Sequence, residues 1–295
     1  MNLADPISQE EVIRLCKQLP SFPLIISKIL AAVNDADANL NELVGYIEQD
    51  PVIAARVLSL ANRAGSRTRN LHEIMDLYTA ISLIGVGNIR EMTLVSCITG
   101  FASNSLSVQI PERFWRHCVA VSVCTQELAR QIDTTRITSE AALVAGLLHD
   151  IGKLWLYSFR PEAYQEVWLD ARRRQVGIED AEQAAFGVDH AVIGAWISQY
   201  WGLPESISHA IQHHHIPGLH CSDPLVSILH VGEVMTNALD LGGGQESRVT
   251  FISTGACEKL GLIWGCAARP DFISLFGRIT ARARHASALF SNSAV

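Results

Sequence analysis

The sequence lacks an excess of basic residues. Its 295 residues include 23 Lys and Arg against 30 Asp and Glu, so the formal net charge is −7. A protein that binds nucleic acid without regard to sequence needs a basic face to neutralise phosphates. We therefore expect no nucleic-acid partner. The two basic runs, Arg172–Arg174 and Arg278–His285, are interpreted as solvated helix faces.

Long apolar stretches are also missing. The most apolar run, Ala141 to Leu148, is far shorter than the roughly 20 residues that cross a bilayer. Residues 1–11 carry neither the basic region nor the apolar stretch of a signal peptide. The seven cysteines are dispersed, and no pair has the Cys-x-x-Cys spacing of a zinc or redox site. We expect a cytoplasmic protein without membrane contact, whose cysteines are free thiols.

No segment alternates apolar and polar residues with the period of two that is typical of strands. Apolar residues recur with helical spacing instead, as in Ile26, Ile29, Leu30 and Val33. Three helix starts carry a capping pattern, in which a polar side chain is followed three residues later by a glutamate. These pairs are Ser8 with Glu11, Asn39 with Glu42, and Asn70 with Glu73. The pattern predicts an all-α protein.

The helical segments divide into two groups. Glycines at 65, 85 and 87 are typical helix stops in the first group, and the polar stretch 102–109 is typical of a linker. We therefore expect two packed helical subdomains. The first is an N-terminal helical bundle over residues 1–105, and the second covers residues 106–295 and ends in further C-terminal helices.

The residues that could support chemistry lie in the second subdomain, beginning with His117. This histidine shares the apolar face of its helix with Phe114, Cys118 and Val121, so we expect it to point inward. A single histidine in that position is more often a hydrogen-bonded core residue than a metal ligand.

The segment Ala141–Lys153 is apolar on all sides until it reaches His149 and Asp150. A buried carboxylate is costly unless a cation or several donors compensate it. Adjacent His and Asp at the end of a buried helix therefore indicate a metal site, and the alternative is a His–Asp pair that braces the core. We expect a helix break at Gly152 to turn Lys153 toward the same cavity.

Three further segments supply candidate ligands. His190 begins an apolar helix face directly after Asp189, a potential helix cap. Residues 213–215 are three consecutive histidines, of which at most two can share one site, because neighbours on a helix diverge by about 100°. Periodicity does not decide which two of His213, His214 and His215 these are. Glu233 lies in another apolar helix.

These candidates offer imidazoles and carboxylates without thiolates. Such a ligand set suits Fe, Mn, Zn or Mg rather than a structural zinc bound by cysteines. With Asp150 as a bridge, the cluster could hold two ions roughly 4 Å apart, the arrangement that activates water for phosphoester cleavage.

The sequence resembles the HDOD family, the HD-related output domains of signalling proteins, over residues 13–240. The resemblance rests on a linked series of motifs. They are Leu19-Pro20 with Pro23, Gln49-Asp50-Pro51, Ala61-Asn62, the stretch from Ala80 to Gly85, the stretch from Gly146 to Gly152, Glu182, Phe186-Gly187, Asp189-His190, the stretch from Trp201 to Glu205, and His214-His215-Ile216-Pro217.

The resemblance implies a scaffold related to the HD phosphohydrolases and to the phosphodiesterases that carry a Gly-Tyr-Pro motif. His117 falls at the first HD position, His149-Asp150 falls at the second, and Lys153 matches the lysine that follows. His190 and His214-His215 match the extra histidines of the Gly-Tyr-Pro class, and Glu233 falls where those enzymes carry aspartate. The implied metal ligands are therefore His117, His149, Asp150, His190, His214, His215 and Glu233, with Asp150 and Lys153 as catalytic candidates.

The resemblance also implies a regulatory function. We expect a signal-transduction module that retains a metal site, with Fe or Mn preferred over Zn or Mg, and that has little or no turnover. Its expected partners are a signalling protein and a small phosphorylated or nucleotide ligand. The alternative is an active metal-dependent phosphohydrolase. Ile216-Pro217-Gly218 stands where the Gly-Tyr-Pro motif would be, which argues against hydrolysis of cyclic dinucleotides.

Overall fold

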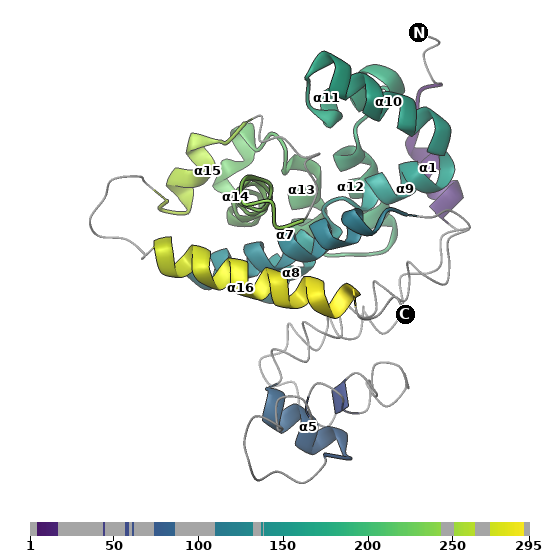
Figure 1. The fold of residues 1–295 in the computed structure, drawn as a ribbon. Coiled ribbons are helices and arrows are strands. Elements are labelled where there is room, and N and C mark those ends of the chain that lie inside the picture. Colours follow the sequence, from purple (N-terminus) through teal and green to yellow (C-terminus); the bar gives the residue numbers. More distant parts are fainter. Residues whose placement is uncertain are drawn as a thin grey trace. The chain divides into compact units, whose positions relative to one another are not determined.

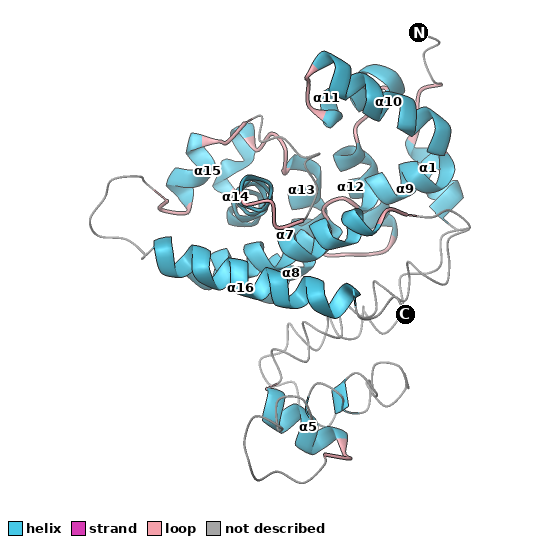
Figure 2. Ribbon diagram, viewed as in Figure 1, coloured by secondary structure: helices cyan, strands magenta, loops and turns pink. Residues whose placement is uncertain are grey.

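The structure is a computed structural model. It describes residues 5–16, 44, 57–58, 61, 74–85, 110–131, 137, 139–242, 251–262 and 272–291. Within these ranges every regular element is a helix and none is a strand (Figure 2). The predicted all-α fold class is therefore confirmed. In the same ranges, no helix has both the length and the apolar character that crossing a membrane requires.

The chain divides into two compact units. One is Ser21–Asn104, and the other combines Met1–Pro20 with Ser105–Val295. The division after Asn104 lies beside the expected boundary at residue 105. Residues 1–20, which the sequence analysis placed with the N-terminal bundle, group with the later part of the chain.

The described helix of the smaller unit is α5 (Leu77–Ile84). The side chain of Asp76 caps its first turn by accepting a hydrogen bond from the Thr79 N–H at 2.7 Å. The helix ends at Gly85, whose φ of 87° is a conformation that favours glycine. The stop expected at Gly85 is therefore present. The capping patterns at 39–42 and 70–73, the stops at 65 and 87 and the linker at 102–109 lie outside the described residues.

The larger unit carries all the candidate site residues (Figure 1). Its described elements are α-helices and one short 3₁₀ helix. In chain order they are α1 (Gln9–Cys16), α7 (Glu112–Gln131), α8 (Ser139–Leu148), α9 (Ile151–Phe159), α10 (Pro161–Arg174), α11 (Ile178–Phe186), α12 (His190–Tyr200), α13 (Glu205–His213), η1 (Gly218–Ser222), α14 (Pro224–Ala238), α15 (Thr254–Lys259) and α16 (Phe272–Ser291).

Helix α7 forms the centre of this unit and packs against α8, α14 and α16. Thr125 on α7 lies at the contact with α8, where its hydroxyl donates to the carbonyl of Ala142 at 2.8 Å. A Cβ added to Gly146 on α8 would lie 2.5 Å from the Thr125 hydroxyl oxygen. A Cβ added to Gly232 on α14 would lie 2.6 Å from the Thr125 methyl carbon. Glycine at both positions lets the three helices meet. This contact brings the end of α8 close to α7. It also brings Glu233, which follows Gly232 on α14, close to α7.

Helix α1 begins as the capping pattern predicts, with the Ser8 hydroxyl accepting a hydrogen bond from the Glu11 N–H at 3.2 Å. The Glu11 carboxylate, however, pairs with Arg160, just after α9. Helix α1 also packs against α9 and α12. These contacts explain why the first residues group with the larger unit.

The last helix, α16, lies along α7 and is attached to it by ion pairs. Glu127 on α7 is buried and pairs with Arg282 of α16. The same carboxylate lies 2.9 Å from Arg130 and 3.5 Å from Arg278. The basic run 278–285 is therefore more than the solvated face that the sequence predicts, because Arg278 and Arg282 attach α16 to α7.

Candidate metal centre

The chain turns between α8 and α9 at His149 and Asp150, and both residues are buried. The helix break expected at Gly152 is wrong, because Gly152 lies inside α9. The glycine is needed for a different reason. A Cβ added to it would lie 1.9 Å from the carbonyl oxygen of His190 at the start of α12. Its absence lets α9 and α12 pack closely, which brings Asp150 and His190 together.

Asp150 lies at the centre of the cluster. The ammonium of Lys153, on the first turn of α9, donates to Oδ2 of Asp150 at 2.8 Å. The Nε2 atoms of His149 and His117 lie 3.3 and 3.7 Å from the same oxygen. The Nε2 atom of His190 lies 3.3 Å from Oδ1, and among the described residues Oδ1 has no hydrogen-bond partner.

Two imidazole rings are held in the tautomer that leaves Nε2 free to bind a cation. His149 Nδ1 lies 2.8 Å from the carbonyl oxygen of Gly146, and His214 Nδ1 lies 2.6 Å from that of Ile211. A carbonyl oxygen only accepts hydrogen bonds, so each Nδ1 carries the proton and each Nε2 keeps its lone pair. Both Nε2 atoms are buried and lack a hydrogen-bond partner within the described part of the chain.

His190 is oriented by Glu182 on α11. The Glu182 carboxylate accepts from the backbone N–H of His190 at 2.8 Å and from its ring Nδ1 at 2.5 Å. A carboxylate in this position orients metal-binding histidines and increases their basicity. Burial alone would lower the pKa of His190, but Glu182 raises it to about 10. Glu182 is not among the site residues predicted from the sequence, although its place among the apolar residues of α11 is a signal for a buried carboxylate.

The structure decides which of the three consecutive histidines belong to the site. Helix α13 ends at His213, and the rings of the next two residues, His214 and His215, have centroids 3.9 Å apart. His215 Nε2 lies 2.7 Å from His190 Nε2. The His213 ring instead stacks on His220 with a centroid separation of 3.7 Å.

Glu233 completes the cluster from α14. Its Oε2 lies 3.7 Å from both His214 Nε2 and His215 Nδ1. The structure therefore brings together all seven residues predicted as metal ligands, which we call the central cluster. Ligand atoms lie within 4.8 Å of one another in each of three overlapping groups. These groups are His117, His149 and Asp150; Asp150, His190, His214 and His215; and His149, His214 and Glu233.

Metal binding requires neutral imidazoles and ionised carboxylates, and four of the seven residues of the central cluster meet this requirement. His190, whose pKa Glu182 raises, and Glu233, whose pKa burial raises, would each release a proton when a cation binds. Burial, with neighbouring imidazoles, lowers the pKa of His117 to about 3 and holds the pKa of His214 and of His215 well below the usual range. Burial opposes ionisation of Asp150, but the positive charges around it hold its pKa well below the ordinary value. Burial likewise opposes the charge of Lys153, and Asp150 nevertheless raises its pKa.

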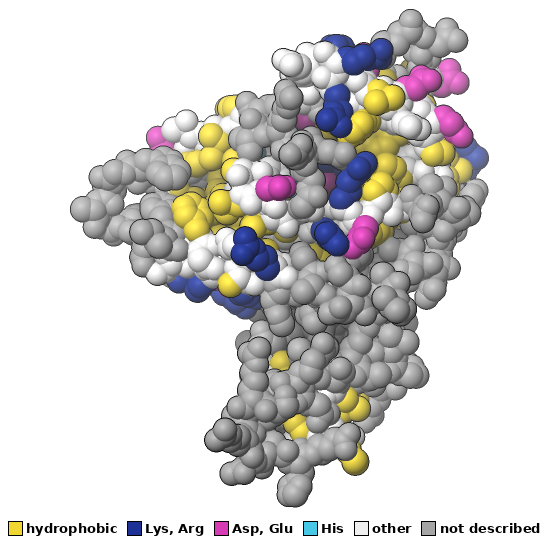
Figure 3. Space-filling model, in the orientation of Figure 1, with side chains coloured by type: hydrophobic (Ala, Val, Ile, Leu, Met, Phe, Trp, Pro, Cys, Tyr) yellow, Lys and Arg dark blue, Asp and Glu magenta, His cyan; other side chains and the backbone are white. Residues whose placement is uncertain are grey.

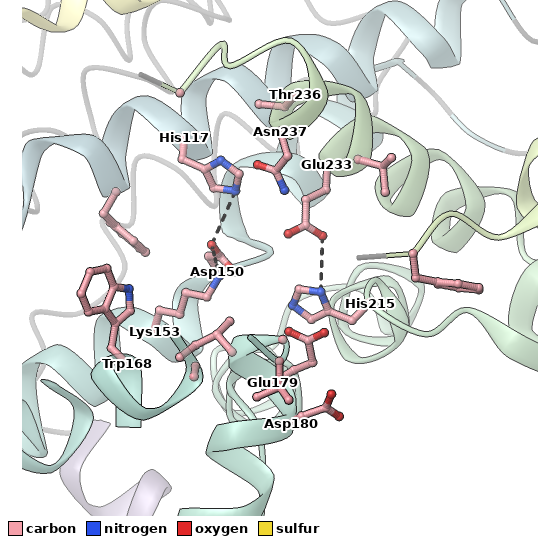
Figure 4. A pocket seen from close by; sticks show the side chains of 18 of the residues that line it. His117, Asp150, Lys153, Trp168, Glu179, Asp180, His215, Glu233, Thr236 and Asn237 are labelled. Atoms are coloured by element: carbon pink, nitrogen blue, oxygen red, sulfur yellow. Dashed lines mark hydrogen bonds and ion pairs between the residues drawn. The ribbon is translucent and has the colours of Figure 1, made fainter. Parts of the chain in front are cut away.

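A cavity of about 560 Å³ opens beside the central cluster. Figure 4 shows His117, Asp150, Lys153, His215 and Glu233 gathered around it. The cluster is therefore reachable by a small molecule from this side.

Trp168, on α10, lines the outer part of the cavity with two arginines. The guanidinium carbon of Arg172 lies 4.7 Å from the centroid of the Trp168 ring, and that of Arg113 lies 5.8 Å from it. Arg172 is exposed, as expected for a solvated face, but it also lines the cavity. Neither Trp168 nor Arg113 was predicted as a site residue, since nothing in the sequence links α7 and α10 to one cavity.

These residues fit a divalent metal ion. Buried polar atoms are normally paired, and an unpaired one costs about 1–3 kcal/mol. Four such atoms, on His117, His149, Asp150 and His214, belong to the central cluster. Cations in the overlapping ligand groups would accept these lone pairs, since each of the four residues belongs to at least one group.

Comparisons with known proteins identify the family of this chain. The profile of the HDOD domain family matches residues 19–217. An uncharacterised protein of Treponema pallidum (strain Nichols) is 24% identical over 226 residues, which are 75% of this chain and 43% of that protein. The chain thus spans less than half the length of this curated relative.

Solved structures show the same fold. An HDOD domain protein from Geobacter sulfurreducens has a TM-score of 0.72 at 20% identity, with 96% of this chain and 98% of that chain covered. A candidate phosphohydrolase from Shewanella amazonensis SB2B has a TM-score of 0.63 at 23% identity, with 95% and 96% covered. A candidate signal transduction protein from Marinobacter aquaeolei VT8 has a TM-score of 0.70 at 18% identity, with 99% and 63% covered. With the family profile matching more than half of the sequence, this chain belongs to the HDOD family.

Proposed function

We propose that this protein is a regulatory module that retains a metal centre at Asp150 and has little or no turnover. One observation carries the proposal. The Nε2 lone pairs of His149 and His214 are buried without a hydrogen-bond partner among the described residues, and both belong to the cluster around the ionised carboxylate of Asp150. A site meant only to brace the core would pair these atoms with protein donors.

The donor set favours Fe or Mn, with Zn or Mg as alternatives, because it combines imidazoles with carboxylates and offers no thiolate. Asp150 belongs to two of the ligand groups and would bridge two ions. His117 and His149 would hold one ion, and His190, His214 and His215 would hold the other. Glu182 would keep His190 oriented toward its ion.

The cavity suits a small phosphorylated ligand only when metal is bound. Its lining contains three cationic side chains, Arg113, Lys153 and Arg172, and five carboxyl groups, those of Asp150, Glu179, Asp180, Glu233 and Asp240. That excess of carboxyl groups repels a bare phosphate, whereas divalent ions at Asp150 would reverse the local charge.

Two features support regulation over turnover. Residues 216–224, where related phosphodiesterases carry their Gly-Tyr-Pro motif, read Ile-Pro-Gly-Leu-His-Cys-Ser-Asp-Pro and contain no lysine or arginine for a second phosphate. The two arginines of the cavity lie over Trp168. We therefore propose that the chain does not cleave cyclic dinucleotides and acts through a signalling protein in the cytoplasm. On the face in Figure 3, the Lys and Arg side chains of the described residues are scattered, and we propose no nucleic-acid partner.

A metal-dependent phosphohydrolase is the second candidate. The observation in its favour is Lys153, a partly exposed cation that lines the cavity beside Asp150 and can bind a phosphoryl oxygen. When bound, metal ions at Asp150 would supply Lewis acidity and water activation for phosphoester hydrolysis. Lys153 would orient the phosphoryl group, and the wall around Trp168 would limit the access of water.

A comparison of wild type with Asp150→Ala separates the two candidates. Both proteins are loaded with Mn or Fe and assayed on phosphomonoesters, mononucleotides and cyclic dinucleotides. The proposal predicts no useful turnover by either protein, together with metal-dependent nucleotide binding by wild type that the variant loses. Robust turnover by wild type that disappears in Asp150→Ala would establish the phosphohydrolase instead.

A further inference from the structure

A second group of histidines lies outside the central cluster, where α13, η1 and α14 meet. His209 and His213 are one turn apart on α13, and His220 lies on η1. All three are partly exposed, and they offer ligand atoms within 4.8 Å of one another. Asp223, the cap of α14, adjoins them, and we call these four residues the surface cluster.

The surface cluster has the internal order of a metal site. Asp223 Oδ2 lies 3.1 Å from His209 Nδ1, and Asp223 Oδ1 accepts from the Leu225 N–H at 2.9 Å. The carboxylate is thus anchored at the helix start, and it accepts the proton of His209 Nδ1. The lone pair of His209 then resides on Nε2 and points toward His220. A carboxylate that fixes a histidine in this way is the usual outer partner of a metal-binding imidazole.

The spacing of the nitrogens agrees with a shared ion. His209 Nε2 and His220 Nδ1 are 3.1 Å apart. Two nitrogens bound to one tetrahedral zinc ion, each about 2.0–2.1 Å from the metal, lie about 3.3 Å from each other. His213 and His220 have ring centroids 3.7 Å apart. The two rings are stacked, with 15° between their planes, so the His213 ring would turn out of the stack to share the ion. Its ligand atom already lies within 4.8 Å of those of His209 and His220.

We propose that the surface cluster is a second metal site, which binds one ion of the zinc class through His209, His213 and His220. Asp223 acts as the orienting carboxylate. Three neutral imidazoles suit zinc, nickel or copper better than magnesium or calcium, which prefer oxygen ligands. The partial exposure of the rings leaves a further coordination position to solvent. This proposal uses none of the central-cluster residues and stands independently of the proposed function.

An ion at this position would connect the two metal sites through the chain. His213 and His220 flank the segment 214–219, which carries His214 and His215 of the central cluster and Ile216 of the cavity wall. Zinc bound at the surface would tie both ends of this segment together. The surface site would thereby stabilise the backbone that presents two central ligands.

The test measures zinc bound per chain by equilibrium dialysis of tag-free protein against buffered zinc, with the bound metal counted by mass spectrometry. His220→Ala removes one imidazole from a partly exposed turn. Cys221→Ser is the matched control, since it alters the next residue of the same turn and replaces the nearest thiol. Both substitutions are made in wild type and in Asp150→Asn, so that zinc at the central cluster is counted separately. If Asp150→Asn does not fold, the comparison of His220→Ala with Cys221→Ser in the wild-type background alone tests the proposal.

We expect His220→Ala to bind one zinc ion fewer than its parent, or to bind that ion at least about tenfold more weakly, while Cys221→Ser matches its parent. Zinc should also raise the melting temperature of Cys221→Ser more than that of His220→Ala. Equal zinc stoichiometry and affinity in the parent and His220→Ala would overturn the proposal. An equal loss in Cys221→Ser would overturn it as well, because it would assign the ion to the thiol.

Discussion

Gly152 on α9 lies so close to His190 on α12 that a methyl group on the glycine would overlap the histidine carbonyl. This backbone contact holds Asp150, two residues before Gly152, near the His190 ring, from which Asp150 Oδ1 is separated by 3.3 Å. The central cluster thus depends on a position that carries no functional group of its own.

Gly152→Ala is predicted to lower the free energy of unfolding by about 1–3 kcal/mol, because overpacking forces the two helices apart. It should also lower the metal content, since the separation moves Asp150 away from His190. Gly277→Ala on α16 is the matched control. An added Cβ there meets no heavy atom of the described residues within 4 Å, so alanine should stabilise the helix by about 0.5–1 kcal/mol. Chemical denaturation of both variants measures their free energies of unfolding. Equal changes in Gly152→Ala and Gly277→Ala would contradict the close contact between α9 and α12.

Glu182→Gln is predicted to weaken metal binding by about 10–100-fold, because the amide holds His190 less firmly and does not increase its basicity. Glu166→Gln, an exposed change of the same chemistry on α10, should bind metal as wild type does. Manganese titration of the two variants provides the measurement. If Glu182→Gln keeps wild-type affinity while remaining folded, then Glu182 does not act through His190.

Glu127→Gln is predicted to destabilise the protein at neutral pH by about 1–2 kcal/mol, because it weakens the ion pairs of α7 with Arg282 and Arg278. Burial would raise the pKa of Glu127, but Arg282 and Arg130 hold it below its ordinary value of 4.5. A carboxyl with a depressed folded-state pKa contributes stability above its unfolded-state pKa and loses it as the pH falls through the folded-state value.

The difference in stability between wild type and Glu127→Gln should therefore be constant near neutrality and shrink as the pH falls below about 4.5. Urea denaturation at a series of pH values measures it. A difference that stayed unchanged down to pH 3 would show that the charge of Glu127 contributes nothing.

Much of the central cluster could be predicted from the sequence, because its residues occupy motif positions on apolar helix faces. His149 and Asp150 stand out as polar residues at the end of an apolar run, and the structure buries both. His213 could not be separated from its two neighbours, since three consecutive residues on one helix give no choice of face. The end of α13 at His213 decides the matter, because the two histidines that follow turn to the central cluster.

Residues that act across the fold were harder to foresee. Trp168 and Arg113 lie on α10 and α7, far apart in the sequence, and only the packing of the helices brings them together. The role of Gly152 was misjudged for a related reason. A glycine near a turn resembles a helix stop, and its real function, a close approach to α12, depends on a helix that begins 38 residues later.

The central claim is that Asp150 organises a metal centre, and metal content tests it most directly. Tag-free His220→Ala, which lacks one proposed ligand of the surface cluster, is loaded anaerobically with Mn or Fe, passed through a desalting column and analysed for metal per chain. The same measurement is made on Asp150→Asn/His220→Ala, with circular dichroism to confirm its helical fold. We predict at least one retained ion in the first protein and its loss in the second. Equal metal content in two folded proteins, or none in either, would contradict the account.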